Sequence, residues 1–429
     1  MVKVGLLGLG TVGTGTAQVL LDSAGRHPLL QEIELTRVGV RSLAKLRSIN
    51  LPQDLLTTDL ETIVSDPSID IVVEVLGGIE PARSLILKAI ANGKHVVTAN
   101  KAVISRYGDE IFTAANKAGV YVMLEAAVGG GIPVIQPLKQ ALSVNRIATV
   151  TGIVNGTTNY ILTRMQTEGS DFDQVLADAQ QLGYAEADPS ADIDGLDAAD
   201  KIAILASLAF GGRIKLSEVC AEGIRAITQV DIAYAEKLGF VIKLLAIASR
   251  IQPDGSTLSV RVHPTLVARS HPLASVNGVY NAILIAGEPL GQVMFFGPGA
   301  GAGATASAVV SDIMNVAAVV KSHPLVQANP LLACSHQDYC AIAPISELVT
   351  RFYARFLTKD LPGTIGKLGT CFGDRGVSLE SIVQIGLQDD LAEIVVVTHD
   401  VREGDFRASL AEIQMLDAVD SIASVLRVL

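Results

Sequence analysis

Three glycines stand at positions 8, 10 and 13, immediately after a short apolar run that opens the chain. The segment Gly8-Leu9-Gly10-Thr11-Val12-Gly13 fits G-x-G-x-x-G, a pattern in which a strand leads through a tight turn into a helix. The first glycine permits the turn, the second lets a ligand approach the backbone, and the third lets the helix pack on the strand. Amides at the start of such a helix point at an anion. We therefore predict that a dinucleotide binds here, with a ligand-free structural turn as the alternative, and the contacting residues would be Gly8, Gly10, Thr11, Val12 and Gly13.

Residues 1–133 repeat one pattern: a short apolar run, a turn, and then a helical stretch. Examples are the predicted strands Val2 to Leu7 and His95 to Thr98, and the predicted helix Gly108 to Ala118. This alternation predicts an α/β fold with a doubly wound parallel sheet of the Rossmann type, forming a dinucleotide-binding domain.

The rest of the chain divides into three segments with different predicted secondary structure. Residues 134–322 mix strands with longer helices, such as Gly195 to Phe210 and one starting near Thr305, which predicts an α+β domain. Residues 323–349 contain several prolines and little periodicity, which favours a linker. Residues 350–429 follow the order strand, helix, strand, strand, helix, strand, and this predicts a ferredoxin-like βαββαβ domain.

Charge and hydropathy argue against two classes of partner. With 33 Lys and Arg against 44 Asp and Glu, the net charge of -11 leaves no broad basic field for nucleic acid. The apolar stretches are strand-sized, well short of the roughly 20 residues of a membrane-spanning helix, so we expect no membrane partner. The chain enters a strand at once, without a signal peptide. These features predict a cytoplasmic protein.

The end of the second predicted strand, Glu34 to Val40, bears on the choice of dinucleotide. Folds that select NAD usually carry Asp or Glu there, to hold the ribose 2′-hydroxyl. This strand instead runs into Arg41, whose guanidinium would attract a 2′-phosphate. We predict a preference for NADP, with use of NAD as well left open.

Several further motifs make the chain resemble a known family over essentially its whole length. They are Thr98-Ala-Asn-Lys101, Glu125-Ala-Ala-Val-Gly-Gly-Gly-Ile-Pro133, Gly152-Ile-Val-Asn-Gly-Thr-Thr-Asn-Tyr160, Gly183-Tyr-Ala-Glu-Ala-Asp-Pro189 and Asp194-Gly-Leu-Asp-Ala-Ala-Asp-Lys201. Together with the glycine turn, they resemble the homoserine dehydrogenases that carry a C-terminal ACT domain. The resemblance implies interconversion of L-homoserine and L-aspartate 4-semialdehyde, a step toward threonine, methionine and isoleucine. It also implies that residues 134–322 form an α+β substrate-binding, catalytic and dimerisation domain.

Asp197 and Lys201 stand four residues apart on a predicted helix, with Ile202 and Leu205 on the opposite stripe. Spacing alone would make them a surface ion pair. The resemblance implies a catalytic pair, because aldehyde reduction needs a proton on oxygen as hydride reaches carbon. Lys201 would deliver that proton, and Asp197 would orient the lysine and the substrate hydroxyl.

The resemblance gives two further side chains a place in the substrate site. Glu186 would bind the substrate's ammonium group, and Lys101, after a strand end, would contact both substrate and cofactor. Exposed loop residues are the alternative for both. The resemblance also places Gly183 and Gly301 beside the cofactor.

The segment Glu125 to Ile132 resembles the family's monovalent cation loop. The resemblance implies sodium, held by the Glu125 carboxylate and the carbonyls of Val128, Gly130 and Ile132, since hard cations take oxygen ligands. A glycine hinge without an ion is the alternative.

The motifs Asp360-Leu-Pro-Gly363 and Gly373-Asp-Arg-Gly376 resemble those of an ACT domain. Such modules pair edge to edge and bind amino acids, so the resemblance implies threonine as effector and a homodimer or homotetramer. A purely structural dimerisation module is the alternative. For the whole chain, the competing classes are a sugar dehydrogenase and a non-catalytic NADP-binding amino-acid sensor, which an assay with homoserine would distinguish.

Overall fold

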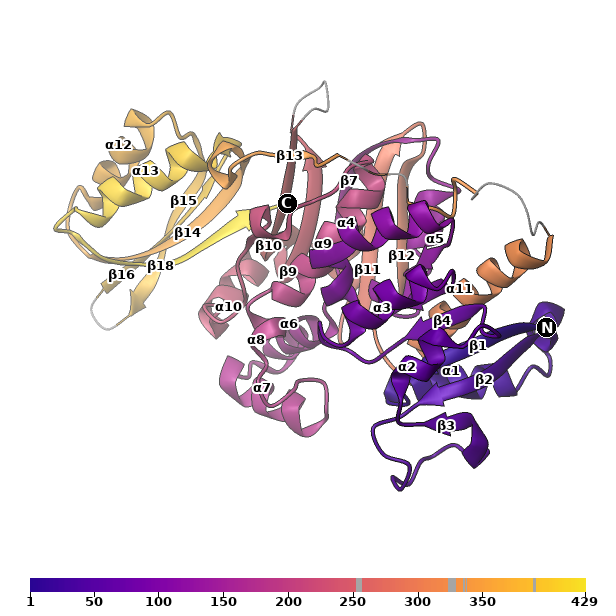
Figure 1. The fold of residues 1–429 in the computed structure, drawn as a ribbon. Helices are drawn as coiled ribbons and strands as arrows, with labels where there is room; N and C mark the ends of the chain where they lie inside the picture. The colour runs from indigo at the N-terminus through magenta and orange to yellow at the C-terminus, as the bar shows by residue number, and fades with distance from the viewer. Residues whose placement is uncertain (252–256, 323–328, 335, 337, 389–390) are drawn as a thin grey trace. The chain divides into compact units, whose positions relative to one another are not determined.

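The computed structural model spans residues 1–429 and describes all of them except 252–256, 323–328, 335, 337 and 389–390 (Figure 1). The chain divides into two compact units. The first consists of Met1–Val150, Asp200–Glu218 and Tyr280–Cys340, and the second of Thr151–Ala199, Val219–Val279 and Ala341–Leu429. Part of the predicted linker, 323–349, lies outside the described residues. The domain boundaries given above stay predictions.

A parallel sheet opens the first unit. Its strands lie in the order β3-β2-β1-β4-β5-β6, and every neighbouring pair is parallel, so the predicted Rossmann-type sheet is confirmed. β4 is buried at every position because crossover helices cover both faces of such a sheet. The elements in chain order are β1 (Val2–Leu7), α1 (Thr11–Leu21), β2 (Ile33–Gly39), β3 (Leu56–Thr57), α2 (Leu60–Ser65), β4 (Ile71–Glu74), α3 (Ala82–Ala91), β5 (His95–Thr98), α4 (Lys101–Ala118) and β6 (Val122–Met123).

Helix α11 (Ala302–Ser322) comes from much later in the chain and completes the core of this sheet. Its Val309 and Ile313 are buried in one apolar cluster with Val4 and Leu6 of β1. By length and composition α11 could cross a membrane, which the sequence analysis did not expect. Because half of it is buried inside the structure, we assign α11 as a core helix.

The first unit also contains α5 (Ile135–Lys139) and an antiparallel pair, β11 (Tyr280–Glu288) and β12 (Gly291–Pro298). Two elements, β7 (Arg146–Ile153) and α9 (Leu196–Phe210), run from one unit into the other. On α9, Asp197 and Asp200 are 7% and 6% exposed, and Ile202 and Leu205 of the predicted apolar stripe are fully buried. Burial on this helix therefore extends beyond its apolar stripe.

The second unit combines helices with a mixed sheet. Its long strands lie in the order β9-β10-β18-β14-β16-β15, in which β10 is antiparallel to β9 and parallel to β18. The short strands β8 and β13 pair with β10, and β17 pairs with β14. The elements are α6 (Gly156–Glu168), α7 (Phe172–Gln181), α8 (Ser190–Ile193), β8 (Cys220–Ala221), α10 (Gln229–Lys237), β9 (Phe240–Arg250), β10 (Thr257–Ala268), β13 (Ala341–Ile342), β14 (Val349–Lys359), α12 (Thr364–Asp374), β15 (Leu379–Gln388), β16 (Leu391–Thr398), β17 (Val401–Arg402), α13 (Glu403–Gln414) and β18 (Val419–Val428).

The stretch from β14 to β18, here called the C-terminal module, has the predicted βαββαβ element order apart from the added two-residue strand β17. Its helices α12 and α13 lie side by side on one face of its sheet (Figure 1). A separate apolar core fills the space between helices and sheet, and it includes Phe352, Phe356, Phe372 and Phe406. The module therefore has a core of its own.

Some predicted boundaries are wrong. α4 begins at Lys101 rather than Gly108, because the Asn100 side chain accepts a hydrogen bond from a backbone amide of the first turn and caps the helix. α11 begins at Ala302, ahead of Thr305. The strands β9 and β12 and the helix α10 were not predicted.

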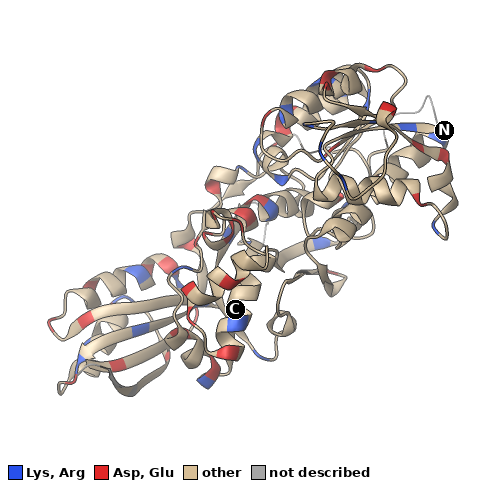
Figure 2. Cartoon of the chain, turned by 90° about the horizontal axis from the view of Figure 1, so that it is seen from below, with Lys and Arg blue, Asp and Glu red and all other residues tan. Residues whose placement is uncertain are grey.

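Charged residues of both signs are interspersed along the helices and strands (Figure 2). Arg83 on α3 pairs with Glu110 on α4, and Arg164 on α6 pairs with Asp178 on α7. Partly exposed pairs of this kind contribute about 0–1 kcal/mol each. The apolar cores are therefore the main source of stability.

Candidate active site

The glycine turn between β1 and α1 has the geometry that a dinucleotide phosphate needs. Gly8 has a φ of +106°, in the region that favours glycine. A Cβ at Gly13 would lie 2.1 Å from the carbonyl oxygen of Gly8, so helix and strand meet too closely for a side chain. A Cβ at Gly10 would meet nothing within 4 Å, so this part of the turn is open. The first-turn amides of α1, including those of Thr11 and Val12, lack intrahelical acceptors and suit an anion.

A cleft beside this turn is lined by basic residues. Its walls include Gly8, Gly10, Arg41, Lys45 and Arg47. Arg41 is exposed and lies beyond the carboxyl end of β2, the edge at which open α/β sheets bind ligands. Arg47 donates from Nη1 to the Lys45 carbonyl at 2.8 Å, which folds the loop back on itself. Lys45 and Arg47 were not predicted as cofactor residues, because only the folded loop brings them to the cleft.

The same edge of the sheet positions Lys101. Glu74, at the end of β4, is fully buried and accepts a hydrogen bond from Thr98 Oγ1 at 2.7 Å. Burial raises the pKa of Glu74, although the hydrogen bonds that it accepts partly oppose the rise. Thr98 ends β5, and Asn100 then caps α4. Lys101 is consequently the half-buried first residue of α4, and Glu74, which sequence alone did not single out, helps to fix it there.

Asp200 joins α4 to α9. Its Oδ1 accepts hydrogen bonds from Ser105 Oγ at 2.8 Å and from Arg106 Nη1 at 2.7 Å. Ser105 lies one turn after Lys101 on α4, and Asp200 directly precedes Lys201 on α9. These bonds therefore fix the two lysine-bearing helices to each other. Asp200 was not predicted as a site residue, although it lies in the motif that ends at Lys201.

In the second unit, Asn155 gathers two carboxylates. Its Nδ2 donates to Asp192 Oδ1 at 2.7 Å and to Asp197 Oδ2 at 2.9 Å, while its Oδ1 caps α6. Asn155 and Asp197 are 5% and 7% exposed. Asp197 does not lie at the surface, because its carboxylate is buried and accepts a hydrogen bond from Asn155, and its catalytic role stays a prediction. Asn155 and Asp192 were not predicted as site residues, although Asn155 lies in one of the motifs that carry the family resemblance.

Gly183 and Glu186 lie on the loop that follows α7. Gly183 has a φ of +75°, as is common for the glycine that ends a helix. The backbone carbonyl of Glu186 accepts a hydrogen bond from Gln180 Nε2 at 3.0 Å, and the residue as a whole is exposed. Their contacts with cofactor and substrate stay predictions.

The turn from Glu125 to Ile132 is buried and tightly packed. The Glu125 carboxylate accepts hydrogen bonds from three successive backbone amides at the start of α5, at 2.6, 2.8 and 2.7 Å. A Cβ at Gly130 would lie 2.4 Å from the carbonyl oxygen of Gly299, so packing alone requires this glycine. Val128 is fully buried.

Gly301 lies directly before α11 and has a φ of +118°. A Cβ at Gly15, on α1, would lie 2.5 Å from the carbonyl oxygen of Ala302. The start of α11 therefore touches the helix that follows the glycine turn. This contact supports the predicted position of Gly301 near the cofactor.

The predicted residues fall into two sets. The first unit contains the glycine turn, Arg41, Lys101, Lys201, the Glu125 turn and Gly301, and the second contains Gly183, Glu186 and Asp197. Helix α9 carries Asp197 in the second unit and Lys201 one turn later in the first. Residues with this spacing lie on one side of a helix.

Comparison with known proteins gives the family. Residues 8–125 match a family model described as "Homoserine dehydrogenase, NAD binding domain", and residues 133–314 match the model "Homoserine dehydrogenase". A homoserine dehydrogenase of Synechocystis sp. is 67% identical over 430 residues, covering 100% of this chain and 99% of that protein. The chain belongs to the homoserine dehydrogenase family.

Solved homoserine dehydrogenases share the fold. The enzyme from Thiobacillus denitrificans is 42% identical with a TM-score of 0.91, and the match covers 100% of this chain and 98% of that one. A hyperthermophilic archaeal homoserine dehydrogenase in complex with NADPH is 26% identical with a TM-score of 0.61, over 76% of this chain and 99% of that one. The chain is thus an NAD(P)-dependent oxidoreductase that acts on a CH-OH group. The predicted family, homoserine dehydrogenase, is therefore confirmed, and the alternatives of a sugar dehydrogenase and a non-catalytic sensor are not supported.

For a homoserine dehydrogenase with this geometry, replacing Asp200 by alanine should weaken the joint between α4 and α9. Asp200 is 6% exposed, and its loss leaves Ser105 and Arg106 without their shared acceptor. We expect the free energy of unfolding to fall by roughly 1–3 kcal/mol, measured by urea denaturation. The specific activity of the folded fraction should also fall. If Asp200→Ala were as stable and as active as the wild type, the joint would have no such role.

Proposed function

We propose that the chain interconverts L-homoserine and L-aspartate 4-semialdehyde with Lys201 as the group that moves the proton at the substrate oxygen. Lys201 donates this proton from Nζ when the aldehyde is reduced and accepts it when the alcohol is oxidised. Asp197, which Asn155 holds in place, orients the lysine and the hydroxyl. Glu186 binds the ammonium group of the substrate, and Lys101 contacts both substrate and cofactor.

NADP is the proposed preferred cofactor, and NAD is the weaker alternative. When bound, it supplies the carbon that exchanges hydride with the substrate. The residues present fit it: Gly10 leaves the turn open to the pyrophosphate, and the cleft beside it contains Arg41, Lys45 and Arg47 for a 2′-phosphate. Gly183 and Gly301 complete the proposed cofactor contacts.

The joint at Asp200 is the observation that carries this proposal, because it holds the helices of Lys101 and Lys201 together within one unit. The test is a spectrophotometric assay of homoserine-dependent reduction of NADP and of NAD. We expect reduction of both, with the higher kcat/KM for NADP. If homoserine supported reduction of neither cofactor, the proposal would be wrong.

We also propose a structural sodium ion at the turn, bound by the Glu125 carboxylate and the carbonyls of Val128, Gly130 and Ile132. Glu125 is 2% exposed, and burial raises its pKa even though three backbone amides oppose the rise. A carboxylate has about four acceptor sites and three are used here, which leaves one for a cation. The hinge without an ion remains the alternative, because packing against Gly299 also explains Gly130.

Replacing sodium by a bulky organic cation separates these alternatives. If sodium binds the folded state, its addition should raise the melting temperature of the full chain, since any ligand of the native state stabilises it. In Glu125→Gln the response should be much smaller. A melting temperature that does not respond to sodium would favour the hinge.

We propose that the C-terminal module is an ACT domain that binds threonine. A pocket in the module is lined by the loop Asp360–Gly366 together with Gln384 and Ile394. Gln384 Nε2 donates to Asp360 Oδ1 at 3.2 Å, and Gly363 precedes α12 with a φ of +88°. A carboxylate and a helix start that line one pocket suit the ammonium and carboxylate groups of an amino acid.

Replacing Asp360 by alanine should remove threonine inhibition, because the ammonium group of the effector loses its partner. The measurement is the ratio of rates with and without saturating threonine. Deleting residues 351–429 is a less clean test, because β18 pairs with β10 and carries a buried arginine. A wild-type rate that is insensitive to threonine would favour the purely structural module.

We further propose a cytoplasmic homodimer or homotetramer. The hairpin of β11 and β12 exposes large apolar side chains, with Phe296 55% exposed and stacked on Tyr280. Exposed apolar patches of this kind mark protein interfaces. Sedimentation of Phe296→Glu should then show smaller species than the wild type.

A further inference from the structure

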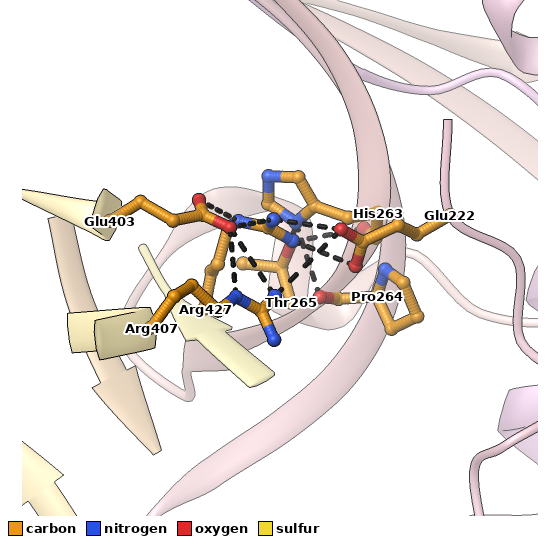
Figure 3. A network of polar contacts seen from close by, with 7 residues as sticks. All are labelled: Glu222, His263, Pro264, Thr265, Glu403, Arg407 and Arg427. Atoms are coloured by element: carbon orange, nitrogen blue, oxygen red, sulfur yellow. Dashed lines mark hydrogen bonds and ion pairs between the residues drawn. The ribbon is translucent and has the colours of Figure 1, made fainter. Parts of the chain in front are cut away.

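Two ion-pair networks, each centred on a buried arginine, bind the C-terminal module to the rest of the second unit. In each, an arginine on a strand of the module bridges one carboxylate of the module and one carboxylate from the segment between α9 and β9. The networks are Glu403–Arg427–Glu222, shown in Figure 3, and Glu393–Arg355–Asp231.

The Arg427 network is closely bonded. Arg427 donates to Glu222 through both terminal nitrogens, at 2.9 and 2.8 Å, and to Glu403 Oε1 at 2.6 Å. Arg427 and Glu403 have side chains that are 4% exposed, whereas the Glu222 side chain is 42% exposed. A bidentate arginine–carboxylate pair fixes orientation as well as distance. The Glu222 side chain is therefore held by the last strand of the module.

Glu222 also contributes negative charge near buried basic side chains. Arg261, on β10, is buried, and burial together with the charge of Arg427 lowers its pKa to about 10. His263 lies beside the same network (Figure 3), and burial and the two arginines lower its pKa well below its usual range. Without Glu222, Arg427 would keep Glu403 as its one bonded carboxylate among the described residues.

The backbone around Glu222 lies against the start of α9. The Ile224 amide donates to the Ile193 carbonyl at 2.8 Å. A Cβ at Gly223 would lie 2.1 Å from the same oxygen, and one at Gly195 would lie 3.3 Å from the Glu222 carbonyl oxygen. The segments 222–225 and 190–195 are therefore in backbone contact. A shift of segment 222–225 should therefore displace segment 190–195, because the two backbones are in close contact.

Segment 190–195 leads directly into the first turn of α9, which carries Asp197. Asp192, within this segment, and Asp197 share the Nδ2 group of Asn155. The position of both carboxylates thus depends on where segment 190–195 lies.

We propose that Glu222, fixed by Arg427, is a positioning residue for Asp197 in homoserine turnover. The ion pair holds segment 222–225 against segment 190–195, and this contact sets the first turn of α9. The C-terminal module thereby contributes to the substrate site without touching substrate. This inference rests on the proposed role of Asp197.

The Arg355 network supplies a matched control. It also joins an arginine of the module to one carboxylate inside and one outside the module. The side chains of Arg355, Asp231 and Glu393 are 5%, 0% and 8% exposed, so its outside partner is more deeply buried than Glu222. Its partner outside the module lies on α10 instead of segment 222–225. Arg355 contacts Asp231 Oδ1 through Nε and Nη2, and Glu393 Oε1 through Nη1. Loss of these contacts should cost stability without moving the start of α9.

The experiment compares Glu222→Gln and Arg427→Lys with Arg355→Lys in the full chain. The lysine variants keep the charge but lose the planar fork of arginine, so both should fold. We expect Glu222→Gln and Arg427→Lys to lower kcat/KM for homoserine about tenfold, since displacements of about 1 Å cost up to about 10²-fold. The KM for NADP should stay at the wild-type value in all three variants.

Hydrogen exchange provides a readout that does not depend on activity. In Glu222→Gln and Arg427→Lys, the amides of residues 190–200 should exchange faster than in the wild type and in Arg355→Lys. Equal effects of the three variants on turnover and exchange, or unchanged exchange in this segment, would overturn the inference. A wild type without homoserine turnover would overturn the proposed function, and the exchange result would still decide whether Glu222 positions α9.

Discussion

Replacing Lys201 by methionine is expected to lower kcat for homoserine oxidation by about 10²–10⁴-fold, the usual contribution of a positioned acid or base. Methionine keeps the apolar stem of lysine but cannot accept the hydroxyl proton. The helix should stay folded, because its buried Ile202 and Leu205 are unchanged. Steady-state kinetics give kcat, and fluorescence titration with NADPH should give an unchanged Kd.

Lys215→Met is the control for this variant. Lys215 belongs to the same unit, and its side chain is 52% exposed and paired with Glu218. Its replacement removes the same charge and should leave kcat at the wild-type value. If Lys201→Met kept more than about a tenth of wild-type kcat, another group would have to move the proton.

Replacing Arg41 by aspartate is expected to reverse the cofactor preference. The variant loses a charge-assisted hydrogen bond to the 2′-phosphate, a loss of about 1.5–3 kcal/mol, and adds repulsion between like charges. Aspartate can instead accept a hydrogen bond from the ribose 2′-hydroxyl of NAD. The NADP-to-NAD ratio of kcat/KM should therefore fall by about 10²–10³-fold, since each 1.4 kcal/mol is about tenfold.

Arg26→Asp is the matched control for cofactor choice. Arg26 is an exposed arginine of the same unit and is absent from the residues that line the cleft. The same change of charge at this position should leave the ratio unaltered. An unaltered ratio in Arg41→Asp would mean that the 2′-phosphate is not bound at the end of β2.

Local sequence was sufficient for the glycine turn and for the order of elements in the C-terminal module. Gly8, Gly10 and Gly13 are each required by local geometry in the turn between a strand and a helix, so their spacing alone was enough to predict the turn. In the module, apolar residues alternate at strand period and then at helix period, so the order of its elements could be predicted.

The start of α4 could not be found from apolar periodicity. Its capping residue, Asn100, lies only two residues beyond the end of β5, and residues 99–107 were not assigned to the predicted helix. This cap can in principle be recognised in a sequence, since Asn is a preferred N-cap residue. The capping role of Asn100 is seen only in the structure, where its Oδ1 accepts a hydrogen bond from the Val103 amide.

The supporting residues of the site depend on long-range contacts. Asp200 meets Ser105 and Arg106 across nearly a hundred residues of chain, with separations of 95 and 94. Glu222 meets Arg427 across 205 residues. Such pairs cannot be identified from a single sequence, because nothing near either residue in the chain indicates which distant residue it will contact in the fold.

The decisive measurement is a crystal structure of the full chain with NADPH and homoserine bound, a pair that cannot react. We expect Lys201 Nζ to lie about 2.6–3.2 Å from the hydroxyl oxygen, while the nicotinamide ring faces the carbon that bears it. An ammonium group turned into solvent and away from that oxygen would contradict the proposed role of Lys201.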